Sequence, residues 1–339
     1  MRRSLARLSI PFREPFVTSS GVVPARELVL LRLEDENGLV GYGEAAPFEP
    51  YDGVPLEAVL AALTNGGDED GLPQARAAEE MARLDLAARR AGQPVGEVGA
   101  EAIAVNRTLP AGPPEEIARR AKEGVRDGFA CFKVKVGLPD DAERVAAVRA
   151  AIGPWPALRV DANGAWTVHE AVAAIESLAV FDLELVEQPC RTLDELAEVR
   201  RRLPGVPIAA DEPIATAADV RVAAAAEACD AVNVKLAPAG GFDAARATVA
   251  AAREHGLEPY LSSTLDGPWG IAAALQLAAT ERLSLACGLA TLELFDAELA
   301  RALPAPERGL LSVPQGPGLG VAVGEEALAE VLVEELSPT

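Results

Sequence analysis

The stretch Cys-Phe-Lys-Val-Lys-Val at 131–136 is one of a series of short apolar runs that return at a nearly constant interval. The other runs are Ala102–Val105, Leu158–Val160, Leu183–Val186, Pro207–Ala210, Ala231–Val234, Pro259–Ser262 and Leu283–Ala286. Segments with helical spacing separate them: Asp140–Ala151, Val168–Leu178, Leu193–Leu203 and Gly241–His255. Strand, helix and strand in this order predict parallel strands with right-handed crossovers, and eight such units predict a closed (β/α)8-type barrel. An open doubly wound sheet is the alternative, but no glycine-rich phosphate turn follows the first run.

The first hundred residues have a different pattern, typical of a small α+β unit. Leu28–Glu34 alternates like a strand, and turn residues lead into a second strand at Leu39–Glu44. Ala75–Arg90 has helical spacing. After Gly309, the strand-like segment Gly320–Val323 is expected to pack back on this unit. We therefore predict an N-terminal α+β capping domain over residues 1–100, completed by a tail from about 309 to 339, and a catalytic barrel over residues 101–308.

Charge and cysteine usage exclude several classes of protein. The 339-residue chain has a formal charge of −21, which argues against nucleic acid or an anionic membrane as the main partner. A small anionic substrate remains compatible, because one bound cation reverses the local field. Four widely spaced cysteines form no CxxC pair, and the N-terminus lacks the apolar run of a signal peptide. No stretch is long and charge-free enough for a membrane span, so we expect a cytoplasmic protein.

Five charged residues close five consecutive predicted strands. They are Lys135, Asp161, Glu187, Asp211 and Lys235, separated by 26, 26, 24 and 24 residues. Each gap is one βα unit, so each residue is expected at the same level of its strand. The carboxyl ends of barrel strands meet on one face, where active sites lie. The sequence thus predicts a ring of three acids with a lysine on each side.

Three carboxylates at an apolar barrel mouth repel one another unless a cation lies among them. Oxygen ligands without histidine favour Mg²⁺ first and Mn²⁺ second. A lysine on either side of a metal-held substrate carboxylate could then remove its α-proton. Taken singly, an acid after an apolar run is more often a helix N-cap or a solvated loop residue, and Lys133 and Lys135 could form a solvated strand face. Five such residues in succession favour the site.

The ordered motifs resemble a known family. They are Lys133-Val134-Lys135, Asp161-Ala162-Asn163, Glu187-Gln188-Pro189, Ala210-Asp211-Glu212 and Asn233-Val234-Lys235, together with the Gly41-Tyr42-Gly43-Glu44 strand. This set is similar to the enolase superfamily, muconate-lactonizing-enzyme subgroup. The resemblance implies a (β/α)7β TIM-like barrel under an α+β capping domain. It also implies that Lys135 is the α-proton base, that Lys235 lies on the opposite face, and that three acids bind Mg²⁺: Asp161, Glu187 and Asp211. Lys133, Asn163 and Glu212 would support them, and loops at Thr18–Val23 and Pro47–Gly53 would close over the substrate.

Within the subgroup, Glu187–Cys190 and Ser262–Asp266 are similar to the o-succinylbenzoate synthases, which perform a syn dehydration in menaquinone biosynthesis. Ser262, Ser263 and Gly288 are then the expected contacts to a small carboxylate substrate. Dipeptide epimerases carry an Asp-x-Asp near the eighth strand, whereas Cys287–Thr291 contains no acid. The triplet Gly267-Pro268-Trp269 and Pro213 depart from the synthase pattern.

Two alternatives stay open. One is an N-acylamino acid racemase or dipeptide epimerase of the same superfamily, in which both lysines exchange protons. The other is a non-catalytic metal- or ligand-binding barrel. The two lysines disfavour this second alternative, since a binding protein needs no base.

Overall fold

The larger sheet is a parallel barrel wall. The computed structural model describes residues 1–18, 21–65, 71–97 and 99–336. Seven parallel strands lie in the order β11-β10-β9-β8-β7-β6-β5. They are β5 (Arg107–Leu109), β6 (Cys131–Lys135), β7 (Ala157–Asp161), β8 (Leu185–Glu187), β9 (Ile208–Ala210), β10 (Ala231–Val234) and β11 (Glu258–Leu261). Cys287 bridges Val105 and Gly288 bridges Ser262, both in parallel, so this short segment takes the eighth strand position and closes the barrel.

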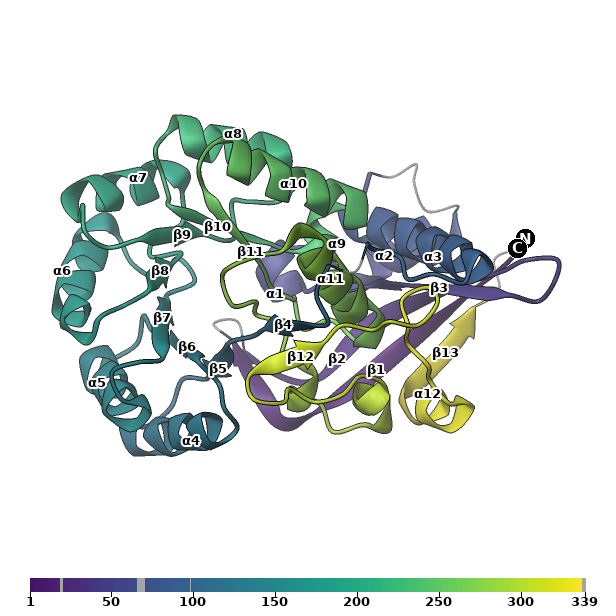
Figure 1. Cartoon of the computed structure of the whole chain (residues 1–339), viewed down its shortest axis with the longest axis horizontal. Helices are drawn as coiled ribbons and strands as arrows, with labels where there is room; N and C mark the ends of the chain where they lie inside the picture. The colour runs from purple at the N-terminus through teal and green to yellow at the C-terminus, as the bar shows by residue number, and fades with distance from the viewer. Residues whose placement is uncertain (19–20, 66–70, 98, 337–339) are drawn as a thin grey trace.

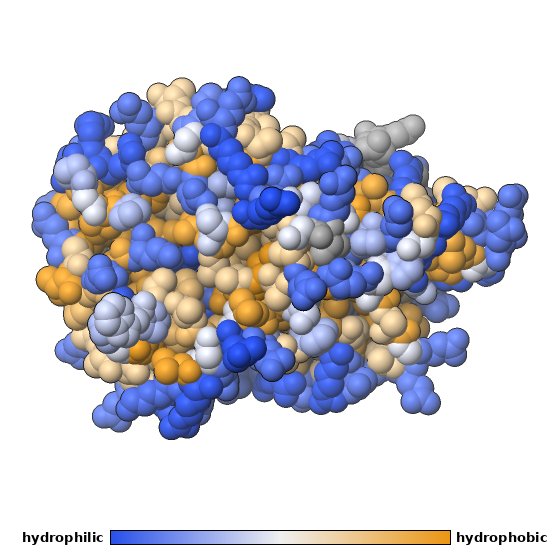
Figure 2. Space-filling model, viewed as in Figure 1, coloured by the Kyte–Doolittle hydropathy of each residue, from blue (hydrophilic) through white to orange (hydrophobic). Residues whose placement is uncertain are grey.

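Helices surround the barrel wall on the outside (Figure 1). They are α4 (Pro114–Arg126), α5 (Asp141–Ile152), α6 (Val168–Leu178), α7 (Leu193–Arg202), α8 (Ala217–Ala225), α9 (Leu236–Ala239), α10 (Phe242–Glu254) and α11 (Pro268–Glu281). Three of them begin with the same capping box, formed by Thr167, Thr192 and Thr216 with an acid three residues later. The box satisfies two backbone N–H groups at the start of each helix and so fixes the residue at which the helix begins. Figure 2 shows mostly hydrophilic side chains over the outer helices of this face and hydrophobic ones toward its middle.

A second, antiparallel sheet lies beside the barrel, in the order β13-β1-β2-β3 (Figure 1). Its strands are β1 (Arg2–Thr18), β2 (Gly21–Glu34), β3 (Val40–Ala45) and β13 (Leu332–Leu336). The helices of this part are α1 (Glu49–Asp52), α2 (Leu56–Thr64), α3 (Pro73–Ala91) and α12 (Glu325–Val331). The short pair β4 (Ala102–Ala104) and β12 (Leu310–Ser312) and three 3-10 turns complete the chain: η1 (Ala179–Phe181), η2 (Leu292–Leu294) and η3 (Glu298–Ala302). The molecule is thus a (β/α)7β barrel with an α+β cap, as the resemblance implies.

Three predicted strands differ from the structure. Ala102–Val105 forms only the entry to the first barrel strand: β4 pairs antiparallel with β12, Val105 bridges Cys287, and the paired part of the first barrel strand is β5. The eighth run was placed too early: the bridging residues are Cys287 and Gly288. Gly320–Val323 is not a strand, and it is β13 that pairs with β1. An apolar run marks burial, but it does not say which neighbour supplies the hydrogen bonds.

Helix α11 is nearly all buried, from Pro268 to Ala279. It packs on the cap at β3 and on the barrel at β11, so it lies at the junction of the two sheets. Among the described residues, no helix has both the length and the apolar character needed to cross a membrane.

Candidate active site

The five charged residues sit at or just after the carboxyl ends of their strands. Lys135, Asp161 and Glu187 are the last residues of β6, β7 and β8, and each is the direct neighbour of the next across the sheet. Glu187 pairs with Ala209 rather than with Asp211, so the register shifts by two residues at β9. The expected common level therefore holds for three strands only, because tilted barrel strands must stagger their register.

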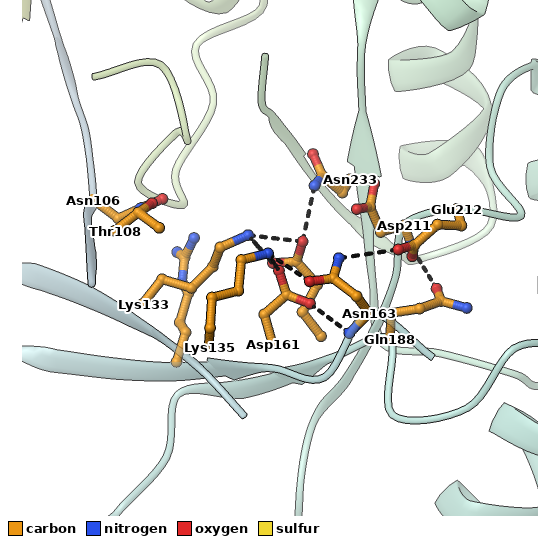
Figure 3. Close-up of polar contacts among 12 residues, drawn as sticks. Asn106, Thr108, Lys133, Lys135, Asp161, Asn163, Gln188, Asp211, Glu212 and Asn233 are labelled. Atoms are coloured by element: carbon orange, nitrogen blue, oxygen red, sulfur yellow. Dashed lines mark hydrogen bonds and ion pairs between the residues drawn. The ribbon is translucent and has the colours of Figure 1, made fainter. Parts of the chain in front are cut away.

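One carboxylate oxygen of Asp161 contacts two ammonium groups (Figure 3). Its Oδ2 is 2.6 Å from Lys135 Nζ and 2.9 Å from Lys133 Nζ. Lys135 Nζ also donates to Asn163 Oδ1 at 2.6 Å, and Asn163 Nδ2 donates to Glu212 Oε1 at 3.0 Å. Asn163 has a φ of 45°, in the left-handed region, and its backbone N–H donates to Asp161 Oδ1 at 3.0 Å. The Asp161 carboxylate, Lys135 and Glu212 are thereby joined in one polar network.

Glu187 is held by side chains from two other strands. Lys133 Nζ lies 3.0 Å from both carboxylate oxygens, and Asn233 Nδ2 donates to Oε1 at 3.1 Å. The Glu187 side chain is fully buried. A single ammonium, that of Lys133, therefore bridges two buried carboxylates, those of Asp161 and Glu187.

Asp211 has partners from both the barrel and the cap. Lys235 Nζ lies 2.5 and 2.7 Å from its two carboxylate oxygens. The hydroxyl of Tyr51, in α1 of the cap, donates to Asp211 Oδ1 at 3.1 Å. The Tyr51 ring also faces Lys235, with Nζ 3.8 Å from the ring centroid. The Gln188 side-chain amide oxygen accepts a hydrogen bond from the Asp211 backbone N–H at 2.8 Å.

Burial and charge act in opposite directions on these groups. Burial alone lowers the pKa of Lys133, but Asp161 and Glu187 outweigh it, and the pKa is raised above its usual value. For Asp161, burial alone raises the pKa, but Lys133 and Lys135 bring it well below its usual range. Burial of Lys235 is likewise outweighed by Asp211, so that its pKa is raised. Lys133, Asp161 and Lys235 are therefore held in their charged forms at neutral pH.

The other two carboxyl groups have raised pKa values. Burial is the main cause for Glu187, which Lys133 only partly offsets. For Glu212, burial followed by the charges of Asp211 and Asp161 raises the pKa to about 7. The mutual repulsion of these neighbouring carboxylates is therefore only partly neutralised by the lysines.

The chemistry of the donor set fits a hard divalent cation. Asp161, Glu187 and Asp211 supply carboxylate oxygens only, and each residue is at most 2% exposed. Within the described parts of the chain, no three His, Cys, Asp or Glu side chains converge as a ready-made metal cage. Each carboxylate is instead paired with a lysine. Binding a metal to the three acids would require these ammonium groups to move aside.

The predicted substrate contacts lie at the seam where the barrel closes. The Ser262 hydroxyl is buried and lacks a hydrogen-bond partner in the part of the chain that the structure describes. A Cβ on Gly288 would lie 2.5 Å from Ser262 Oγ, so glycine leaves room for this hydroxyl. Ser263 Oγ lies 2.8 Å from Thr291 Oγ1. Ser262 is therefore the candidate with free hydrogen-bonding capacity toward a ligand.

Sequence reasoning missed two residues of the site. Asn233 stands in the Asn233-Val234-Lys235 motif with no predicted role, although it precedes Lys235 by two positions and so points to the same side of the chain. Tyr51 lies in the expected loop Pro47–Gly53, but no local signal aims it at Lys235. Of the other expected loop, Thr18–Val23, positions 19 and 20 lie outside the described residues.

Comparisons with known proteins identify the family to which the chain is similar. Residues 116–327 match the family described as Enolase C-terminal domain-like. The o-succinylbenzoate synthase of Thermobifida fusca is 39% identical over 95% of this chain and 91% of its own length. N-succinyl Arg/Lys racemase from Bacillus cereus superposes with a TM-score of 0.91 at 25% identity, covering 99% of both chains. A dipeptide epimerase from Enterococcus faecalis, complexed with Mg and the dipeptide L-Leu-L-Tyr, has a TM-score of 0.86 at 28% identity, covering 95% of this chain and 99% of its own. On these matches and on the order of its charged strand ends, the chain belongs to the enolase superfamily.

Proposed function

We propose that this protein is a metal-dependent lyase, an o-succinylbenzoate synthase that dehydrates a cyclohexadiene carboxylate in menaquinone biosynthesis. One observation carries the proposal: Lys135 and Lys235 each contact one of three buried carboxylates at the barrel mouth. Such a site can remove a proton next to a bound carboxylate. The 39% identity to the Thermobifida fusca synthase supports the choice of dehydration.

Lys135 is the proposed base. Its side chain is 29% exposed, against 10% for Lys133 and 8% for Lys235, so it is the lysine most open to a substrate. Neutral Lys135 Nζ would take the α-proton, and the C–H electron pair would pass into the substrate carboxylate as an enediolate. The C–O bond then breaks, and the same Nζ returns the proton to the departing hydroxide as water. One residue on one face gives a syn elimination.

The other polar residues of the site would bind the metal ion, stabilise the negative charge of the intermediate and orient the ligands. Asp161, Glu187 and Asp211 would hold Mg²⁺, with Mn²⁺ as a substitute, and the ion would stabilise negative charge on the substrate carboxylate. Lys235 would act as a fixed positive charge near the enediolate, since it is buried against Asp211 and the Tyr51 ring. Lys133, Asn163 and Glu212 would orient the ligands, and Ser262, Ser263 and Gly288 would line the substrate.

A substrate panel tests the proposal directly. The cyclohexadiene carboxylate should be dehydrated faster than N-succinyl amino acids are racemised or dipeptides are epimerised. The assays are the loss of diene absorbance, and optical rotation or α-proton exchange in D₂O. Epimerisation of dipeptides at higher kcat/KM than dehydration would refute the assignment.

The second candidate is N-acylamino acid racemisation, which the likeness to the Bacillus cereus racemase favours. It needs both lysines as bases, so a Lys235 buried against Asp211 is less suited to it than Lys135. Free dipeptides are the least favoured substrates. Residues 288–291 contain no acid to pair with an ammonium, and burying an unpaired ammonium is costly.

The proposal also covers organisation and location. It assigns residues 1–100 and about 309–339 to the capping domain and residues 101–308 to the barrel, supported by the pairing of β13 with β1. It places the enzyme in the cytoplasm, supported by four cysteines that are all free and buried: Cys131, Cys190, Cys229 and Cys287.

A further inference from the structure

The Gly41–Glu44 motif of β3 has two different faces. A Cβ on Gly43 would lie 1.9 Å from the Ala78 carbonyl oxygen, so this face of the strand packs directly on α3. The alternate residues point the other way: the Tyr42 ring lies 5.8 Å from the Trp269 ring, in α11. Glu44 is 2% exposed, yet it lies outside the catalytic network described above. A buried carboxylate in this position requires a structural partner.

The partner of Glu44 is the first turn of α11, across the junction of the two sheets. Its carboxylate oxygens accept the backbone N–H of Gly267 at 2.6 Å and of Gly270 at 3.2 Å. A Cβ on Gly267 would lie 2.8 Å from Glu44 Oε2, and one on Gly270 would lie 3.0 Å from Oε1. The two glycines therefore form a cradle shaped for this carboxylate, which accounts for Gly267 where the sequence departs from the synthase pattern.

Arg26 of β2 makes a second connection across the same junction. It is 3% exposed. On the cap side its guanidinium donates to the carbonyl oxygens of Ala46 at 2.8 Å and Pro47 at 2.5 Å. On the barrel side it donates to those of Thr264 and Leu265, both at 3.2 Å. Leu265 has a φ of 63°, an unfavourable conformation for a leucine that surrounding contacts must hold.

The groups that Arg26 contacts on the cap and on the barrel are both close in sequence to residues of the candidate active site. On the cap side, its guanidinium lies 5.0 Å from the ring of Phe48, and the Phe48 carbonyl accepts the Tyr51 backbone N–H at 2.7 Å. Tyr51 in turn contacts Lys235 and Asp211. On the barrel side, Thr264 follows the predicted substrate contact Ser262 by two residues. One side chain thus ties the cap segment that carries Tyr51 to the loop after β11.

We propose that Arg26 and Glu44 are positioning residues that hold the cap segment 46–52 in register with the barrel, so that Tyr51 stays on Lys235 and Asp211. The inference rests on the proposed function, in which that end of the site stabilises the enediolate. Neither residue touches the reacting atoms. A small displacement of a positioned group can cost about 10²-fold in rate, so the effect on turnover should be large.

The first test compares Arg26→Lys with Arg32→Lys. Lysine keeps the charge but lacks the planar guanidinium that donates to five carbonyl oxygens, those of Glu27, Ala46, Pro47, Thr264 and Leu265. Arg32 lies in the same strand, is about one-third exposed and pairs with Glu34, so it is the matched control. Arg26→Lys should lower kcat/KM at least tenfold and speed amide hydrogen exchange in residues 46–53. Mg²⁺ affinity should stay within about twofold, because the ligands all lie on the barrel. Arg32→Lys should leave all three values unchanged.

Glu44 gives a graded second test. Glu44→Gln keeps one acceptor oxygen for the two glycine N–H groups, whereas Glu44→Ala keeps none. Activity and exchange protection should therefore follow the order wild type, Gln, Ala.

The proposal is overturned if exchange in residues 46–53 does not change in Arg26→Lys. It is overturned equally if exchange rises while kcat/KM stays within twofold, or if Mg²⁺ binding falls in parallel with activity. The kinetics use whichever panel substrate the wild type turns over. Failure to dehydrate thus refutes the proposed function alone, while the exchange measurements still judge the positioning role.

Discussion

Replacing Lys235 by arginine separates one-base dehydration from two-base racemisation. Lys235 is buried, with Nζ 2.5 and 2.7 Å from Asp211 and 3.8 Å from the Tyr51 ring centroid. Arginine keeps the positive charge but cannot act as a neutral base. Overpacking a buried site costs about 1–3 kcal/mol. If misfit is the only effect, dehydration should slow roughly fivefold to 150-fold.

Lys135→Arg should have a larger effect on dehydration. Its side chain is 29% exposed, so misfit is smaller, but the base itself is lost. General-base catalysis contributes about 10²–10⁴-fold, so both dehydration and α-proton exchange should fall by at least that factor. Exposed Lys122 on α4 supplies the control, since Lys122→Arg changes the same side chain far from the barrel mouth.

The assays are dehydration kinetics and α-proton exchange of N-succinyl amino acids in D₂O, with Mg²⁺ affinity measured for every variant. In Lys235→Arg, dehydration should survive while any racemisation disappears. The one-base mechanism is refuted if Lys235→Arg loses dehydration as completely as Lys135→Arg while Mg²⁺ still binds with wild-type affinity. Lys235→Ala with added small amines then tests misfit, because restored turnover would identify Lys235 as a proton carrier.

Three further predictions follow from the same contacts. EDTA should abolish activity, and Mg²⁺ or Mn²⁺ should restore it; full activity of the metal-free enzyme would contradict this. Calorimetry should show that Mg²⁺ binding is weakened about tenfold or more by Asp161→Asn, Glu187→Gln or Asp211→Asn. Gly288→Ala should lower the free energy of unfolding by about 1–3 kcal/mol, because the new Cβ would lie 2.5 Å from Ser262 Oγ. Adding Ser262→Ala to this variant should recover part of the lost stability. Urea unfolding measures both variants, and additive losses would argue against this contact. Burial, followed by the charge of Asp266, raises the pKa of Glu44 to about 8, with Arg26 as the opposing charge. Between about pH 4.5, the ordinary pKa of a glutamate, and about pH 8, the folded state then binds more protons than the unfolded chain. The free energy of unfolding therefore falls by at most about 1.4 kcal/mol per pH unit as the pH rises. Glu44→Gln should flatten this slope in urea unfolding at pH 5.5 and 7.5, and an unchanged slope would show that Glu44 is ionised throughout.

Periodicity alone was enough to predict the barrel, because each buried strand and each amphipathic helix has its own local pattern. The helices α6 (Val168–Leu178) and α10 (Phe242–Glu254) lie within one residue of their predicted bounds. The eighth strand was misplaced, since Cys287 and Gly288 form bridges rather than a full ladder. The strand β13 (Leu332–Leu336) was missed, because its partner β1 is more than 300 residues away in the sequence.

What the sequence determined by itself is which side chains stand at the strand ends. The place of a residue within its βα unit depends on the local sequence. The nearly constant spacing from Lys135 to Lys235 therefore already implied that these charged residues lie on one face of the barrel. The partners of these side chains were decided by the tertiary structure. Lys133 bridges Asp161 and Glu187, and the cap places Tyr51 on Lys235, 184 positions away in the sequence. Strand stagger and the docking of the cap set these contacts, and both depend on how distant segments pack together rather than on any local pattern.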